Sequence, residues 1–104
     1  MSWIYLLLAG VFEIGFTTCL KMSESFSKPL PTLGFIFFTI LSFAMLTKAL
    51  QGIPLGTAYA IWTGIGACGT ALIGIWLFGD PAGTLRILFL LLLIASIIGL
   101  KLVS

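Results

Sequence analysis

Long apolar runs alternate with short polar segments along this chain, and each run has the length of a membrane-crossing helix. We expect four such helices, at residues 3–21, 30–48, 54–78 and 84–103, because about 20 apolar residues span the hydrocarbon core of a bilayer. The short segments between them contain turn formers, among them Pro29, Gly52 and Pro81. Such short loops make consecutive helices antiparallel neighbours. The pattern predicts a single four-helix transmembrane domain over residues 1–104.

Composition favours a membrane protein of the all-α class. Hydrophobic residues make up 61% of the chain and charged residues 8%, which is more apolar surface than a soluble domain of this size can bury. The net charge of +2, without a basic run, gives no indication of nucleic-acid binding. The sequence contains no histidine, the commonest metal ligand and general base. We therefore expect lipid contacts, no metal site and no enzymatic activity.

One charged residue lies at the centre of an apolar run. Glu13 stands in the middle of residues 3–21, whereas every other charge lies near the end of a hydrophobic segment. An ionised carboxylate in hydrocarbon is costly, so it persists only where it has a partner or a task. Glu13 is therefore the predicted centre of the functional site.

The helix face around Glu13 carries groups suited to a binding site. Residues three and four positions away share that face. Gly10 is expected to leave space beside the carboxylate, Phe16 supplies an aromatic ring, and Thr17 supplies a hydroxyl. This face favours a site for a small ligand within the membrane.

Two aromatic residues of the third helix fit a site for an organic cation. Tyr59 and Trp62 offer cation–π attraction of roughly 0.5–2 kcal/mol each, and Ser42 adds a hydroxyl near the middle of the second helix. The alternative is an interfacial aromatic belt, which suits Trp3 and Tyr5. Trp62 lies well inside its helix, so the binding site is the favoured interpretation.

Small residues predict close helix contacts and a bend. The third helix is rich in Gly and Ala, and Gly64 and Gly66 make a bend there easy; ordinary tight packing explains the same pattern. In the fourth helix, Ala95 and Gly99 form a small-xxx-small pair. That pair is a candidate contact with a second copy of the chain.

The basic residues give little instruction about orientation. Lys21, Lys28 and Arg86 lie on one side of the membrane, and Lys48 and Lys101 on the other. The positive-inside bias is therefore weak. Two outcomes stay open: a weakly preferred single orientation, and insertion in both orientations.

A single copy is too small to enclose a pathway. One chain supplies one central acid, and four helices enclose little space, so a homodimer is the smallest plausible transporter. Two copies in opposite orientations would be related by a pseudo-two-fold axis in the membrane plane, a symmetry that many transporters use.

Three motifs resemble the small multidrug resistance family of bacterial transporters, over nearly the whole chain. They are Ala-Gly-Val-Phe-Glu at 9–13, Pro-Leu-Gly-Thr-Ala-Tyr-Ala-Ile-Trp-Thr-Gly-Ile-Gly at 54–66, and Gly-Leu-Lys at 99–101. The resemblance implies a proton-coupled exporter of organic cations in the bacterial inner membrane. It also implies an antiparallel homodimer, with protons as coupling ion and no other cofactor. Glu13, Tyr59, Trp62 and Ser42 match the family's site residues.

The branch within that family is mixed. Gly10, Ser42 and the motif at 54–66 are similar to the guanidinium-exporter branch, which usually carries Trp where this chain has Phe16. The threonine at position 17 is similar to the residue found there in the polyaromatic-drug branch of the family. The resemblance implies export of guanidinium-type compounds together with small quaternary ammonium ions; the alternative is a broad exporter of polyaromatic cations.

Two other function classes stay open. A pore lined by Glu13 is one, although a pore favours several polar residues along one helix face, and the first helix offers mainly Glu13 and Thr17. A non-transporting membrane subunit is the other, with Glu13 paired to a basic residue of another protein.

The favoured function is transport, with a mechanism that needs few parts. Two copies of Glu13 share one cavity, where protons and a cation compete for the two carboxylates.

Overall fold

The computed structural model describes residues 1–103. It contains four α-helices: α1 (Ser2–Met22), α2 (Pro29–Ala49), α3 (Leu55–Leu77) and α4 (Thr84–Leu102). Each is long and apolar enough to cross a membrane. The predicted all-α class and the predicted helices are confirmed, and the observed bounds lie within one residue of the expected ones.

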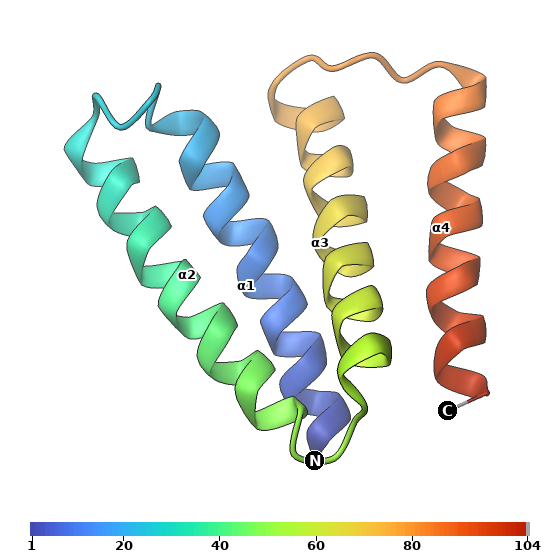
Figure 1. Ribbon diagram of the computed structural model, residues 1–104. Coiled ribbons are helices and arrows are strands. Elements are labelled where there is room, and N and C mark those ends of the chain that lie inside the picture. The colour runs from blue at the N-terminus through green and yellow to red at the C-terminus, as the bar shows by residue number, and fades with distance from the viewer. Residues whose placement is uncertain (104) are drawn as a thin grey trace.

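The helices form one layer. They lie side by side in the order α2, α1, α3, α4 (Figure 1), and the molecule measures 41 × 35 × 16 Å. The smallest dimension is little more than the diameter of one helix with its side chains, about 10–12 Å. Both sides of the layer are therefore open, and one chain does not wall a passage on all sides.

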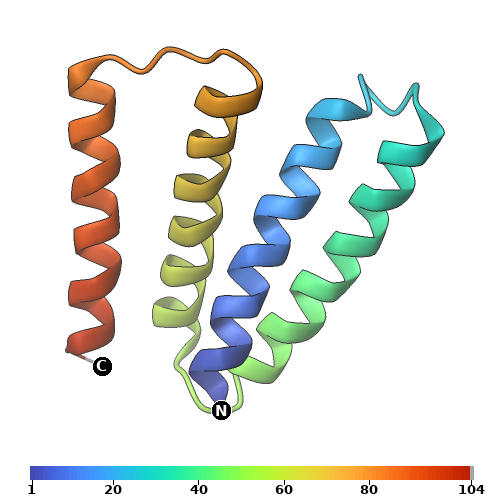
Figure 2. The ribbon, with the colours of Figure 1, turned by 180° about the vertical axis from the view of Figure 1, so that it is seen from behind.

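The connections define two ends of the layer. The α1–α2 and α3–α4 connections lie at one end, while the N-terminus, the α2–α3 connection and the end of α4 lie at the other (Figure 2). As a result, α1 and α3 run in the same direction, side by side. This parallel pair positions the candidate site.

Proline and glycine mark the helix boundaries. Pro29 occupies the first turn of α2, where its missing amide costs no hydrogen bond. Pro54, at the expected start of the third helix, is the residue before Leu55 and has an extended backbone (φ −58°, ψ 147°). After α3, Gly79 turns the chain with φ 69°, and the Asp80 amide then donates to the Gly74 carbonyl over 3.0 Å.

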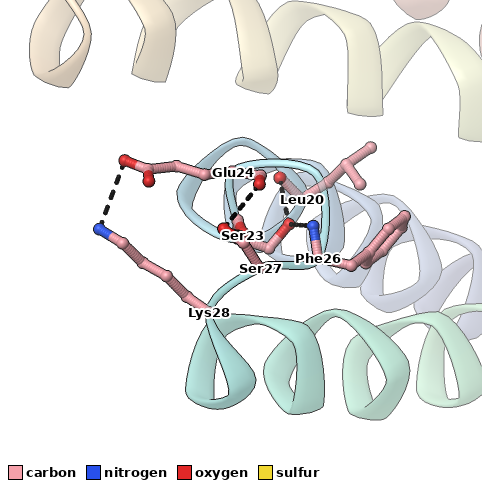
Figure 3. A network of polar contacts seen from close by, with 6 residues as sticks. All are labelled: Leu20, Ser23, Glu24, Phe26, Ser27 and Lys28. Atoms are coloured by element: carbon pink, nitrogen blue, oxygen red, sulfur yellow. Dashed lines mark hydrogen bonds and ion pairs between the residues drawn. The ribbon is translucent and has the colours of Figure 1, made fainter.

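The α1–α2 connection is a tight turn held by a buried serine (Figure 3). Three consecutive residues have positive φ: Glu24 (48°), Ser25 (62°) and Phe26 (67°). The Ser23 hydroxyl donates to the Leu20 carbonyl over 2.7 Å and accepts from the Phe26 amide over 3.2 Å. Across the turn, Lys28 pairs with Glu24, with 3.3 Å between Nζ and Oε1. Residues other than glycine rarely adopt left-handed conformations, which carry a steric cost. These bonds offset that cost in the turn.

Aromatic rings hold the basic residues at the opposite end. Lys48 lies over the Tyr5 ring, 5.3 Å from its centroid, and Lys101 lies over the Trp3 ring, 5.0 Å from its centroid. Trp3 and Tyr5 therefore sit near a helix end, as their interpretation as interfacial residues requires.

The outermost helix, α4, is open along its length. It packs on α3, where Ile97 fills the space beside Gly64, and none of its residues Thr84–Leu102, all described here, is buried. Ala95 is exposed, and a Cβ on Gly99 would meet no heavy atom within 4 Å. Both residues are accessible to a second copy, and their use in a dimer stays a prediction.

Candidate functional site

The Glu13 carboxylate lies against α3 at Gly66. A Cβ on Gly66 would overlap the carboxyl carbon and Oε2 of Glu13, so only glycine fits at that position with Glu13 in this conformation. Within residues 1–103, Oε1 of Glu13 is buried and has no hydrogen-bond partner. A buried carboxylate oxygen without a partner is costly, and a bound proton or cation would satisfy it.

A hydrogen-bonded chain joins three helices one turn away from Glu13. The Trp62 indole donates from Nε1 to the Ser42 hydroxyl over 3.0 Å, and that hydroxyl donates to the Ala9 carbonyl over 2.7 Å. Ser42 is fully buried and Trp62 is 8% exposed. The structure thus brings these two predicted residues together near Glu13, where they bond to each other and to α1.

Two more aromatic rings surround Trp62. Tyr59, which is 56% exposed, lies with its ring centroid 5.8 Å from that of Trp62. Phe43 of α2 meets Trp62 edge-on at 5.3 Å. Tyr59 and Trp62 are predicted site residues, whereas Phe43 was not expected from the sequence. Of the three rings, Tyr59 and Phe43 are exposed and Trp62 is buried.

A threonine pair lies on the other side of Glu13. The Thr17 and Thr70 hydroxyl oxygens are 2.6 Å apart, and Thr17 also donates to the Glu13 carbonyl over 3.0 Å. Thr17 was a predicted site residue, but Thr70 was not. Its spacing was the available signal, because Thr70 follows Gly66 by four residues, as Thr17 follows Glu13.

Two predicted site residues, Gly10 and Phe16, pack between helices, and for Gly10 this differs from the expected open space. Gly10 does not leave open space beside the carboxylate: a Cβ there would lie 2.6 Å from a methyl carbon of Ile65, so Gly10 lets α3 approach α1. Phe16 packs edge-on against Phe35 of α2, with 5.9 Å between ring centroids. Phe16 therefore shapes the α1–α2 side of the site.

The two glycines predicted to bend α3 are packing residues in this structure. Gly66 faces Glu13, and a Cβ on Gly64 would lie 2.6 Å from the Ile97 side chain. The helix is continuous from Leu55 to Leu77. Their role in close packing is thereby observed, and a bend at these positions stays a prediction.

Four helices able to span a membrane, with one acid in mid-span between α1 and α3, fit a small membrane transporter. The sequence profile of the Small Multidrug Resistance protein family matches residues 1–93, and the chain belongs to that family. It is accordingly a multi-pass protein of the bacterial inner membrane.

Curated relatives match along the full chain. A guanidinium exporter of Proteus vulgaris is 49% identical over 104 residues, which is 100% of both chains. A guanidinium exporter of Salmonella typhimurium is 49% identical over 102 residues, covering 98% of this chain and 97% of its own. A guanidinium exporter of Citrobacter freundii matches to the same extent.

Proposed function

We propose that this protein exports small organic cations, guanidinium-type compounds among them, in exchange for protons that bind the same carboxylate. The observation that carries the proposal is the buried Oε1 of Glu13, which has no hydrogen-bond partner among residues 1–103. Membership of a transporter family and relatives named guanidinium exporters support the substrate class.

The chemistry of exchange follows from one site with two competing ligands. A carboxylate accepts in-plane hydrogen bonds from a guanidinium ion, and charge strengthens those bonds. Protonation removes the negative charge, so the cation leaves. An ionised carboxylate without a partner is costly in hydrocarbon. The protein therefore changes between its inward-facing and outward-facing states only with a proton or a cation bound. Proton entry then drives cation exit.

The working unit that we propose is a homodimer of antiparallel copies. One chain is a single layer, 16 Å thick, and it supplies one central acid. Facing copies would enclose two Glu13 side chains in one cavity, and the exposed α4 surface with Ala95 and Gly99 offers room for contact between copies. Opposite orientations would make the inward-facing and outward-facing states equivalent.

Coupled flux in liposomes tests the proposed function. We expect purified protein to move protons when a guanidinium gradient is imposed, and to move guanidinium when a proton gradient is imposed, at a fixed ratio. The panel includes guanidinium, singly substituted guanidinium and small alkyl quaternary ammonium ions, all of which we expect to be transported. Cation leak without proton movement would indicate a pore, and no flux would indicate a structural subunit. Transport of large polyaromatic cations alone would contradict the proposed substrate class.

The same panel tests the role of Phe16 in selectivity. We expect Phe16→Trp to narrow transport toward guanidinium, because an indole N–H orders the carboxylates for in-plane hydrogen bonds, whereas a quaternary ammonium has no N–H to use them. Phe12→Trp is the matched control, because Phe12 stacks on Phe38 of α2, with ring centroids 6.1 Å apart. If the unmodified protein already rejects every quaternary ammonium, this explanation of Phe16 is wrong.

Labelling from each side of the membrane tests the antiparallel arrangement. A reporter cysteine at Ser104, with Cys19 and Cys68 replaced by alanine, is expected to be about equally accessible from both sides. The reason is the near balance of basic residues, three against two. Adding lysines at the exposed positions Leu50 and Gln51 and replacing Lys28 and Arg86 by glutamine changes the basic count from three against two to one against four. This change should impose one orientation and lower activity, and coexpression with an oppositely oriented version should restore it. Labelling of the unmodified protein from one side only would exclude antiparallel dimers.

A further inference from the structure

A polar cavity lies between α1 and α3, toward the end where the α1–α2 and α3–α4 connections lie. Its volume is about 170 Å³, which is room for several water molecules. Its polar lining consists of three hydroxyls and two charged side chains: Thr17, Thr18, Thr70, Lys21 and Asp80. We call this set the threonine vestibule. Ile73, Gly74 and Phe78 complete the lining.

The vestibule ends one helical turn from Glu13. Because α1 and α3 are parallel, steps of four residues keep the two helices in register: Gly66 faces Glu13, Thr70 bonds Thr17, and Gly74 and Lys21 both line the cavity. Each step of four residues is slightly more than one turn, about 6 Å along the axis. The threonine pair therefore lies between the cavity and the carboxylate.

The hydroxyl pair has the chemistry of a gate for hydrogen-bond donors. Thr17 Oγ1 lies 3.0 Å from the carbonyls of both Glu13 and Ile14. A hydroxyl has one proton, so Thr17 donates toward those carbonyls and accepts from Thr70. When the Thr17–Thr70 bond opens, the Thr17 oxygen is free to accept from the N–H of a cation or from water. A quaternary ammonium ion has no N–H, so it cannot replace Thr70 as the hydrogen-bond donor to Thr17.

The mouth of the cavity carries charges of both signs. Asp80 and Lys21 line it together, so the aspartate offsets the repulsion that a lone lysine would exert on a cation. Asp80 packs against Gly74 of α3. Its carboxylate lies in the space that a side chain on Gly74 would fill, and its backbone amide donates to the Gly74 carbonyl over 3.0 Å. A cation therefore meets no unbalanced positive charge on entry.

We propose that the threonine vestibule is the route by which cations with N–H donors reach Glu13, and that the Thr17–Thr70 hydrogen bond is its inner gate. This inference rests on the proposed function and adds a selectivity element outside the Glu13–Trp62 region. In an antiparallel dimer, one vestibule would open at each membrane surface. Each copy would thereby admit cations from its own side.

Exchange of labelled cation at equal pH on both sides tests the gate, since it removes proton transport from the measurement. We expect Thr17→Val, which removes the oxygen that accepts from the cation, to slow guanidinium exchange about five- to tenfold, the size of one lost hydrogen bond, and to slow exchange of a small quaternary ammonium less than twofold. Thr47→Val is the matched control, because the Thr47 hydroxyl is exposed and bonds only its own helix, at the Phe43 carbonyl; both rates should be unchanged. Equal slowing of both cations by Thr17→Val would show a structural role and overturn the proposal.

Cysteine accessibility tests the route without requiring transport. In a background lacking Cys19 and Cys68, Thr70→Cys should react with a membrane-impermeant cationic thiol reagent at least about tenfold faster than Leu72→Cys, since Leu72 lies at similar depth on the outer surface and is 50% exposed. Saturating guanidinium should slow the reaction at position 70. Equal reactivity at the two positions would overturn the vestibule.

The two proposals fail in different ways. Absence of coupled flux in the unmodified protein would reject the proposed function, whatever the labelling shows. Normal coupled flux together with an unreactive Thr70→Cys would reject the vestibule and leave the proposed function intact.

Discussion

Glu13→Gln is expected to abolish proton-coupled export and to weaken cation binding by at least about 100-fold, while the helices and the dimer still form. The amide keeps the shape of the side chain but has no charge to attract a cation and binds no proton at working pH. Hydrogen bonds to charged groups contribute roughly 1.5–3 kcal/mol each, and the cation would lose its charge-assisted bonds to this oxygen. Coupled flux in liposomes and calorimetric titration of guanidinium measure both effects.

Glu24→Gln is the matched control for that experiment. Glu24 is a carboxylate in the α1–α2 connection, exposed and paired with Lys28, and exposed ion pairs contribute about 0–1 kcal/mol. We expect its replacement to leave export unchanged. Normal coupled export by Glu13→Gln would rule out the carboxylate exchange mechanism.

Gly66→Ala is expected to reduce transport by at least about tenfold, because the new methyl group would occupy the space of the Glu13 carboxylate. Overpacking in a close contact costs typically 1–3 kcal/mol, and the carboxylate must move to relieve it. Alanine also favours a helix over glycine by about 1 kcal/mol, so the unfolding temperature alone understates the effect. Flux and guanidinium affinity are therefore the decisive measurements.

Two further variants make this prediction specific. Gly56→Ala, on the same helix, adds a methyl group that would meet no heavy atom within 4 Å, so we expect full transport and equal or higher stability. In the Gly66→Ala background, Glu13→Asp withdraws the carboxylate by one methylene and should recover part of the guanidinium affinity. Full affinity in Gly66→Ala alone would show that the close contact between Glu13 and Gly66 is not needed for binding.

The helices and the central acid could be predicted from the sequence because their signals are local. Apolar runs of the right length determine four spans, and hydrocarbon requires their backbone groups to bond within each helix. The same solvent makes a carboxylate in mid-span exceptional, which identifies Glu13 without knowledge of its neighbours. Ser42 and Trp62 also stood out, as polar and aromatic groups deep within apolar helices.

Other parts of the site depend on the register between α1 and α3. Whether space beside Gly10 stays open depends on which α3 residue faces it, and Ile65 does. The same register places Gly66 against Glu13 and Thr70 against Thr17, and no pattern within one helix specifies an offset between two.

The apolar runs alone predict four membrane crossings and one acid in mid-span, because burial in lipid acts on each segment separately. Which residues lie beside that acid depends on how the helices pack. Close contacts at small residues fix how far α3 is offset along α1. At this offset between α1 and α3, Gly66 leaves space for the Glu13 carboxylate, and Thr17 bonds Thr70 at the inner end of the cavity.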